Sequence, residues 1–145
     1  SLWNLYGLET LLDDATRTRV WLKSGGYLVV EPTEALTVID VNTGKYEGGK
    51  NADATFVKIN QEAAVEIAKQ LRLRNISGII IIDFIDMKSE ADKLDTLSVL
   101  NKELKKDPVK ATLVDMTKLN LAEVTRKKVK KSLREQLGNY DYRRN

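Results

Sequence analysis

The sequence contains neither cysteine nor histidine among its 145 residues. Without cysteine there is no disulfide and no thiolate metal site, and without histidine the commonest zinc ligand and general base is missing. Any metal must therefore be held by oxygen, and any catalysis must use carboxylates, amides, lysine, arginine or activated water. No apolar stretch reaches the about 18 residues of a membrane span, and no secretory leader pattern opens the chain. We expect a soluble, cytoplasmic protein without a membrane span.

The charge of the chain is unevenly distributed, although its net value is only +3. Residues 118–145 hold nine Lys or Arg against three Asp or Glu, a net charge of +6. Residues 1–117 hold fifteen against eighteen, a net charge of −3. A basic segment on a near-neutral body is typical of a nucleic-acid contact. It is also typical of a solvated helix face, and composition does not choose between the two.

The order of the elements that the sequence predicts is that of a layered α/β domain with a mixed sheet. Leucines at helical spacing predict a first helix, and two short runs around a Ser-Gly-Gly turn predict a β-hairpin. A long amphipathic stretch and a Ser-x-x-Asp capping pattern predict two further helices. The expected elements are a helix at 3–16, strands at 19–23, 27–31 and 34–41, a helix at 53–74, a buried strand at 79–82, a helix at 89–106, a strand at 111–116 and a basic helix at 121–137.

Two aspartates follow apolar runs at the expected carboxyl ends of two strands. Asp40 ends the run Ala-Leu-Thr-Val-Ile, and Asp83 ends four consecutive isoleucines. In open α/β sheets this edge is where ligands bind. Two carboxylates that converge there suit Mg²⁺, which prefers oxygen ligands and phosphate. The pattern therefore indicates a metal site for phosphate chemistry. From spacing alone, the alternative that each aspartate caps its strand or the following turn stays open.

Three neighbouring features complete this candidate site. Asn42 lies two residues beyond Asp40, so both side chains point the same way on an extended chain. Its amide can orient a water or a phosphate oxygen, while Mg²⁺ at the aspartates polarises a phosphoryl oxygen and helps to generate a hydroxide nucleophile. Asp86 lies close to Asp83, and we expect a structural role for it in the loop. The glycine-rich loop from Gly44 lacks the Walker pattern, so we interpret it as a turn.

Four segments together resemble the catalytic region of the ribonuclease E/G family. They are GGYLVVEPTEALTVIDVNTG at 25–44, QLRLRN at 70–75, GIIIIDFIDM at 78–87 and LAEVTRK at 121–127. In order and spacing they fit the family over roughly residues 17–135, which is far more specific than one short motif. The resemblance implies a deoxyribonuclease-I-like catalytic subdomain at 17–137. It also implies that the helix at 1–16 ends a preceding ribonuclease-H-like subdomain and that 138–145 form a tail.

The resemblance implies a function and a set of site residues. In this family two aspartates bind Mg²⁺, a nearby asparagine assists, and single-stranded RNA is cut to leave 5′-phosphate and 3′-hydroxyl ends. Carried onto the matching motifs, the catalytic residues are Asp40, Asn42 and Asp83. The metal ligands are Asp40 and Asp83, and Mn²⁺ is expected to substitute for Mg²⁺. The side chains expected to contact RNA phosphates weakly, with plain solvent exposure as the alternative, are Lys110, Arg126 and Lys127.

The resemblance covers only part of the family's architecture. Relatives carry an RNA-binding barrel with a 5′-end sensor and a paired-cysteine zinc link between protomers, for which this chain has no matching segment. We therefore expect the catalytic-core fragment of an enzyme of RNA processing and decay, weakly active or inactive alone, without zinc, and homo-oligomeric when whole. Two alternatives stay open: a non-catalytic RNA-binding or assembly module that uses the basic C-terminal helix, and a phosphate- or nucleotide-binding domain. Only the first hypothesis requires the trio of Asp40, Asn42 and Asp83.

Overall fold

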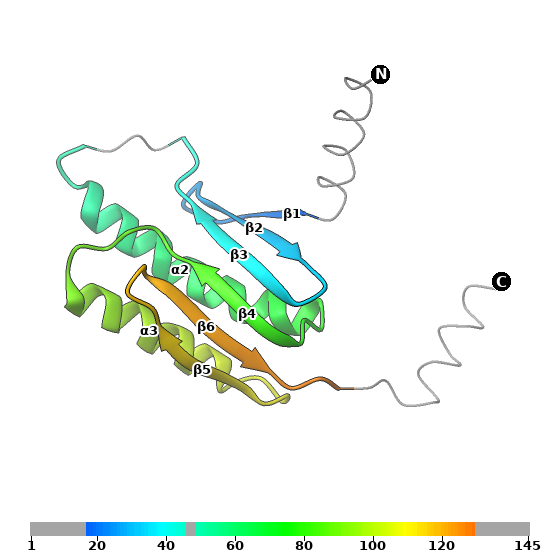
Figure 1. The fold of residues 1–145 in the computed structure, drawn as a ribbon. Coiled ribbons are helices and arrows are strands. Elements are labelled where there is room, and N and C mark those ends of the chain that lie inside the picture. The colour runs from blue at the N-terminus through cyan, green and yellow to red at the C-terminus, as the bar shows by residue number, and fades with distance from the viewer. Residues whose placement is uncertain (1–16, 46–48, 130–145) are drawn as a thin grey trace, which may run out of the picture.

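The computed structural model describes residues 17–45 and 49–129, which form a six-stranded mixed sheet with two helices on one of its faces (Figure 1). The sheet order is β1-β2-β3-β4-β6-β5. The mixed sheet, its hairpin start and the packed helices confirm the predicted fold class. In chain order the elements are β1 (Thr18–Trp21), β2 (Tyr27–Pro32), β3 (Leu36–Asn42), α2 (Ala52–Leu73), β4 (Gly78–Asp83), α3 (Glu90–Leu104), β5 (Ala111–Met116) and β6 (Leu121–Arg126).

The connectivity contains one parallel pair among the described strands, and this pair positions the candidate site. β1, β2 and β3 form an antiparallel meander, and α2 then carries the chain back so that β4 runs parallel to β3. β6 lies antiparallel to both β4 and β5. Because only β3 and β4 run in the same direction side by side, their carboxyl ends meet at one edge of the sheet.

The hydrophobic core lies between the sheet and the two helices, which are behind the sheet in Figure 1. Alternate residues of each strand point into it, as the two-residue period of a strand requires. α2 contributes a stripe of small and apolar side chains at helical spacing, as the sequence predicts. None of the helices in the described ranges is long and apolar enough to cross a membrane. The central members of the core are Leu28, Ile39, Ile59, Ala63, Ile67, Leu71, Ile80, Ile82, Leu100 and Val124.

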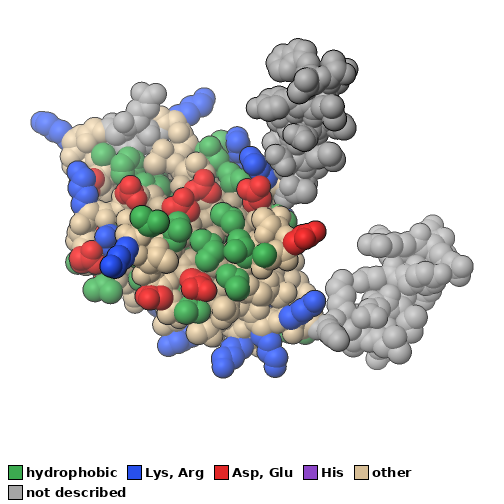
Figure 2. All heavy atoms as spheres, viewed as in Figure 1, with side chains coloured by type: hydrophobic (Ala, Val, Ile, Leu, Met, Phe, Trp, Pro, Cys, Tyr) green, Lys and Arg blue, Asp and Glu red, His purple; other side chains and the backbone are tan. Residues whose placement is uncertain are grey.

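The opposite face of the sheet is open, because no helix of residues 17–45 or 49–129 packs on it. Figure 2 looks onto this face and shows hydrophobic and acidic side chains gathered over the strands, with Lys and Arg around the rim. Ile79 keeps 40% of its surface exposed there, although it belongs to the isoleucine run. The predicted buried strand at 79–82 is therefore buried on one face only within the described structure: Ile80 and Ile82 are buried, and Ile79 faces outward.

The start of α3 confirms the predicted capping position. Ser89 Oγ accepts a hydrogen bond from the backbone N–H of Asp92 at 3.4 Å. Such a bond satisfies one of the free N–H groups in the first turn of a helix. α3 therefore begins one residue after the serine, where the Ser-x-x-Asp pattern places it.

The predicted helix at 121–137 is wrong over its first part, because Leu121–Arg126 form strand β6. Along this stretch burial alternates residue by residue, which is the period of a strand. β6 pairs with β4 on one side and with β5 on the other, so tertiary hydrogen bonding overrides any local helical tendency. Residues 130–137 of the predicted helix lie outside the described residues, as does the predicted helix at 3–16.

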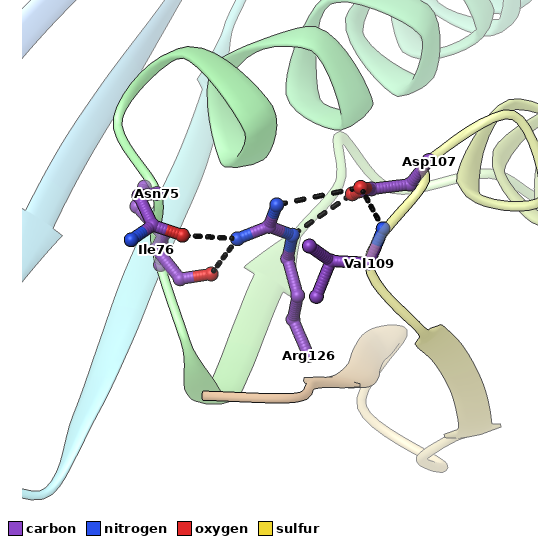
Figure 3. A network of polar contacts seen from close by, with 5 residues as sticks. All are labelled: Asn75, Ile76, Asp107, Val109 and Arg126. Atoms are coloured by element: carbon purple, nitrogen blue, oxygen red, sulfur yellow. Dashed lines mark hydrogen bonds and ion pairs between the residues drawn. The ribbon is translucent and has the colours of Figure 1, made fainter. Parts of the chain in front are cut away.

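Arg126 closes the end of β6 in a buried polar network (Figure 3). Only 4% of the residue is exposed. Its Nε and Nη2 donate to the carboxylate of Asp107 at 2.8 and 3.3 Å, and its Nη1 donates to Asn75 Oδ1 and to Ile76 O at 3.0 and 3.1 Å. The backbone N–H of Val109 donates to the same carboxylate at 2.9 Å. The network joins the end of β6 to the loops that follow α2 and α3.

This network corrects the expectation that Arg126 contacts RNA. Four of its donor contacts are already made inside the protein, so the guanidinium offers little to a phosphate or to water. Burial alone would raise the pKa of Asp107, but hydrogen bonds from Arg126 and Val109 and the charges of Arg126 and Arg72 outweigh it and lower that pKa. Arg126 is therefore a structural residue.

Candidate active site

Asp40 and Asp83 are direct neighbours across the parallel strands β3 and β4. They are register partners, and both side chains point to the open face because Ile39 and Ile82 point into the core. Adjacent strands lie about 4.8 Å apart, so two carboxylates in register are within joint reach of one ion. The predicted juxtaposition of the two aspartates is thus present in the fold.

The two carboxyl groups influence one another. The pKa of Asp40 is raised, first because burial penalises its charge, and then because the charge of Asp83 and a side-chain hydrogen bond to it favour the protonated form. A hydrogen bond from the backbone of Val41 acts in the opposite direction. The like charge of Asp83 repels a charge on Asp40 unless a proton or a cation lies between them. A divalent cation would relieve this repulsion.

Asn42 lies on the same side of β3 as Asp40, as its spacing predicts, and is the register partner of Tyr27. Its Nδ2 is buried and has no hydrogen-bond partner within the described part of the chain. A buried donor left without a partner costs about 1–3 kcal/mol. If the side chain turned toward the open face, a ligand oxygen beside Asp40 would satisfy this donor.

Close packing of two turns fixes the backbone at Asn42. A Cβ atom added to Gly26 would lie 2.8 Å from Asn42 O and 3.0 Å from Ile59 Cγ2, so only glycine fits there. Gly44 has a φ of +72°, and a Cβ on it would collide with the carbonyl oxygen of Gly25. The sequence shows these glycines as turn residues. Their contact across the hairpin is a tertiary feature that no local pattern reveals.

Asn60 fixes the loop that follows Asp83. It is fully buried on α2, donates from Nδ2 to Ile85 O at 2.8 Å and accepts from Ile85 N at 3.0 Å. Buried Phe84 and Met87 anchor the same loop, and Thr96 Oγ1 donates to Met87 Sδ at 3.3 Å. Sequence reasoning missed Asn60, although a polar residue inside the apolar stripe of α2 was a usable signal.

The residues present fit a magnesium ion held by two carboxylates. Mg²⁺ keeps several waters and takes one or two protein carboxylates together with substrate phosphate. Asp40 and Asp83 supply that number of ligands on an open face. Within 17–45 and 49–129, no group of three or more acidic side chains could hold a metal, so exposed Asp86 does not join the pair. Asp86 lies in the loop after β4, and its expected structural role there stays a prediction.

Comparison with known sequences identifies the family to which this fold and site belong. The model of the ribonuclease E/G family matches residues 1–129. The chain belongs to the ribonuclease E/G family. The resemblance in the four sequence segments is thereby confirmed.

Relatives named ribonuclease E and relatives named ribonuclease G both match this chain. Ribonuclease E of Nostoc sp. is 46% identical over 133 residues, which are 92% of this chain and 19% of the relative. Ribonuclease G of Salmonella typhimurium is 45% identical over 138 residues, which are 95% of this chain and 28% of the relative. Ribonuclease G of Haemophilus influenzae is 46% identical over 132 residues, 91% of this chain and 27% of the relative. The chain thus spans 19–28% of the length of these relatives.

The two lysines that were expected to contact RNA lie at the end of the sheet opposite to the two aspartates. Lys110 and Lys127 are exposed, and the backbone N–H of Lys127 donates to Lys110 O at 2.9 Å. They border a hollow of about 340 Å³ that Thr112 and Thr125 also line. β6 runs antiparallel to β4, so this hollow lies at the opposite end of the strands from Asp83. The structure therefore groups Asp40, Asn42 and Asp83, and places the lysines apart from them.

Proposed function

We propose that this domain is the catalytic core of a Mg²⁺-dependent endoribonuclease that hydrolyses single-stranded RNA to 5′-phosphate and 3′-hydroxyl ends. The observation that carries the proposal is the register pairing of Asp40 with Asp83 on parallel strands. Membership of the ribonuclease E/G family supports RNA as the substrate, since the relatives are named ribonucleases.

Each site residue has a separate role in this proposal. Asp40 and Asp83 would hold Mg²⁺, or Mn²⁺ in its place, and their two charges would fix the cation on the open face. When bound, the cation supplies Lewis-acid polarisation of the phosphate and a lower pKa for the attacking water. Asn42 would turn its unpaired Nδ2 from the buried position to a phosphate oxygen and thereby orient the scissile group.

The proposed reaction is the addition of water to phosphorus. The water oxygen forms a bond to phosphorus while the bond from phosphorus to the 3′ oxygen breaks. The 3′ oxygen takes up a proton, and the phosphate remains on the 5′ oxygen. Because these 145 residues contain no histidine, no imidazole of this domain transfers a proton in these steps. The proton that the attacking water loses passes to solvent.

Substitution of the paired carboxylates tests the proposal. Asp40→Asn and Asp83→Asn each remove one ligand charge with little change in shape, so we expect Mn²⁺ affinity to fall and RNA cleavage to be lost. Asp86→Asn is the matched control, because it removes an exposed carboxylate three residues away and should leave both properties intact. The measurements are Mn²⁺ titration of the chain and cleavage of single-stranded RNA by the whole enzyme, with analysis of product ends. Full activity of Asp40→Asn would contradict the assignment.

A further inference from the structure

An exposed aromatic cluster lies on the open face of the sheet beside the carboxylate pair. Trp21 keeps 61% of its surface exposed, and its ring centroid is 5.1 Å from that of Tyr27 at an interplanar angle of 53°. The Arg19 guanidinium carbon lies 4.5 Å from the centroid of the Tyr27 ring and 5.7 Å from that of the Trp21 ring. Tyr27 and Arg19 therefore hold the tryptophan in place while leaving much of it accessible.

Strand register connects this cluster to the candidate active site. Trp21 is the partner of Tyr27, which is the partner of Asn42. In the next row, Arg19 pairs with Val29 and Val29 with Asp40. All of these side chains share one face because residues at even spacing along a strand point the same way. β1 and β3 are two strand spacings apart, so the backbone of Trp21 lies about 10 Å across the sheet from Asn42.

The charge around the site limits how RNA can be held there. Glu31 and Glu123 lie on the same face as the aspartates, and Figure 2 shows acidic side chains over the strands with the cations at the rim. Phosphates next to the site are therefore repelled except where a cation neutralises the aspartates. A contact to the neutral π-face of a base carries no such penalty, and aromatic side chains commonly bind unpaired bases by stacking.

We propose that Trp21, held by Tyr27 and Arg19, is a stacking platform for an unpaired base of the RNA strand that crosses Asp40 and Asp83. The inference rests on the proposed function and adds a substrate-positioning residue to it. It also supplies a physical reason for a single-strand preference, because both faces of a base inside a duplex are covered by its neighbours. Trp21 positions the strand and takes no part in the chemical step.

Affinity for defined oligonucleotides tests the stacking contact. In this 145-residue chain with Trp3→Phe, Trp21 is the sole tryptophan, and its fluorescence should be quenched by single-stranded RNA in the presence of Mg²⁺. Trp21→Ala should weaken binding by about 5- to 150-fold, the change that corresponds to ~1–3 kcal/mol per stacked base. Trp21→Phe should recover most of the affinity, because it keeps a π-face. Val114→Ala is the matched control, since Val114 is 53% exposed on the far edge strand β5.

An abasic series locates the contact. Oligonucleotides that each lack one base are bound to the parent chain and to Trp21→Ala. At one position near the scissile phosphate, removing the base should lower the affinity of the parent chain for the oligonucleotide. The affinity of the Trp21→Ala variant should not change. Equal affinity of both proteins for every oligonucleotide, or a Trp21 effect that is the same at all positions, would overturn the inference. So would a tryptophan signal in the whole enzyme that RNA does not change because another part of the protein covers Trp21.

The outcomes separate this inference from the proposed function. Loss of cleavage in Asp40→Asn with retained quenching supports both. Mg²⁺-dependent cleavage that requires Asp40 but is indifferent to Trp21→Ala, in KM as well as in kcat, overturns only the inference. A Trp21-dependent, base-specific affinity without any Asp40-dependent cleavage overturns the proposed catalysis and leaves the stacking site in place.

Discussion

At the scale of single residues, the carboxylate pair opposes folding and favours ligand binding for the same electrostatic reason. Asp83 helps to raise the pKa of Asp40, so holding the two groups in register has a free-energy cost in the absence of a cation. Titratable groups whose pKa is shifted by burial and a charged neighbour occur often at functional sites. The unpaired Nδ2 of Asn42 adds a second unsatisfied group beside them. Both features would be relieved by a cation together with a phosphate.

Asn60 offers a test of how the fold supports Asp83. Asn60→Leu removes both hydrogen bonds to Ile85, and each buried group left unpaired costs about 1–3 kcal/mol. We expect a lower free energy of unfolding, by about that amount or more, together with weaker Mn²⁺ binding because the loop after Asp83 shifts. Urea unfolding and Mn²⁺ titration measure the two effects.

Lys69→Ala, at an exposed position on the same helix, is the control for that substitution and should change neither quantity. A variant Asn60→Leu that unfolds more easily but binds Mn²⁺ normally would show that Asn60 stabilises the fold without positioning the metal ligands.

At the scale of elements, the crossover through α2 determines where the candidate site lies. It returns the chain so that β4 pairs parallel with β3, and parallel pairing brings two strand ends with their aspartates to one edge. The same connectivity places the Arg126 network at the opposite end of β4, roughly 16 Å away for five residue steps of about 3.3 Å. One end of the strands is therefore fixed by a satisfied ion pair, while the other end keeps its carboxylates available.

The buried ion pair predicts a specific dependence of stability on pH. The pKa of Asp107 is lowered in the folded state, so its contribution is fully present above the ordinary value of 3.8 and is lost as pH falls through the lowered pKa. Asp107→Asn should therefore be less stable than the parent at neutral pH and should lose less stability below about pH 4. Urea unfolding at several pH values checks both expectations.

The control is Asp95→Asn, which alters an exposed carboxylate on α3. Breaking one partner of a buried pair typically costs about 3–5 kcal/mol, so Arg126→Met should also be strongly destabilising. Equal stability of the Asp107→Asn variant and the parent across this pH range would contradict the role given to the network.

At the scale of the whole molecule, the two faces of the sheet differ in what covers them and in which side chains they carry. The helix-covered face contains the core, whereas the open face carries acidic and apolar groups with cations at its rim (Figure 2). Lys and Arg at the rim of this face would attract a polyanion from solution. The polyanion could then approach the acidic groups at the centre of the face where a bound cation neutralises them. This arrangement agrees with the proposed cleavage of an RNA strand on the open face.

This chain covers only a small share of the length of its relatives, which leads to a prediction about the rate of RNA cleavage. Positioning of reactants can supply about 7–11 kcal/mol of a barrier, and most of the length of the relatives lies outside the matched region. We expect the 145-residue chain to bind Mn²⁺ but to cleave single-stranded RNA far more slowly than a whole relative. Parallel cleavage assays at equal Mg²⁺ concentration measure the difference. Equal rates would mean that this domain positions its substrate unaided.

The sequence by itself determined most of the elements and named the residues of the candidate site. Local patterns suffice for the hairpin around Gly26, the amphipathic helix α2 and the serine that starts α3, because turn residues, hydrophobic periodicity and helix caps act over a few positions. The two aspartates after apolar runs and the neighbouring Asn42 already indicated a cation and phosphate, since carboxylate oxygens are the ligands that Mg²⁺ prefers and an amide can orient a phosphate oxygen.

The tertiary structure alone decided which distant residues meet. Leu121–Arg126 become a strand because β4 and β5 bond to it on both sides, and Arg126 is buried because Asp107 and Asn75 surround its charge. Asn60 acquires its role only when its side chain bonds the backbone of Ile85, and Trp21 comes to lie two strands from Asn42 only through two strand pairings. These relations depend on contacts between residues far apart in the chain. Local propensity carries no information about them, whereas the packed sheet fixes them together.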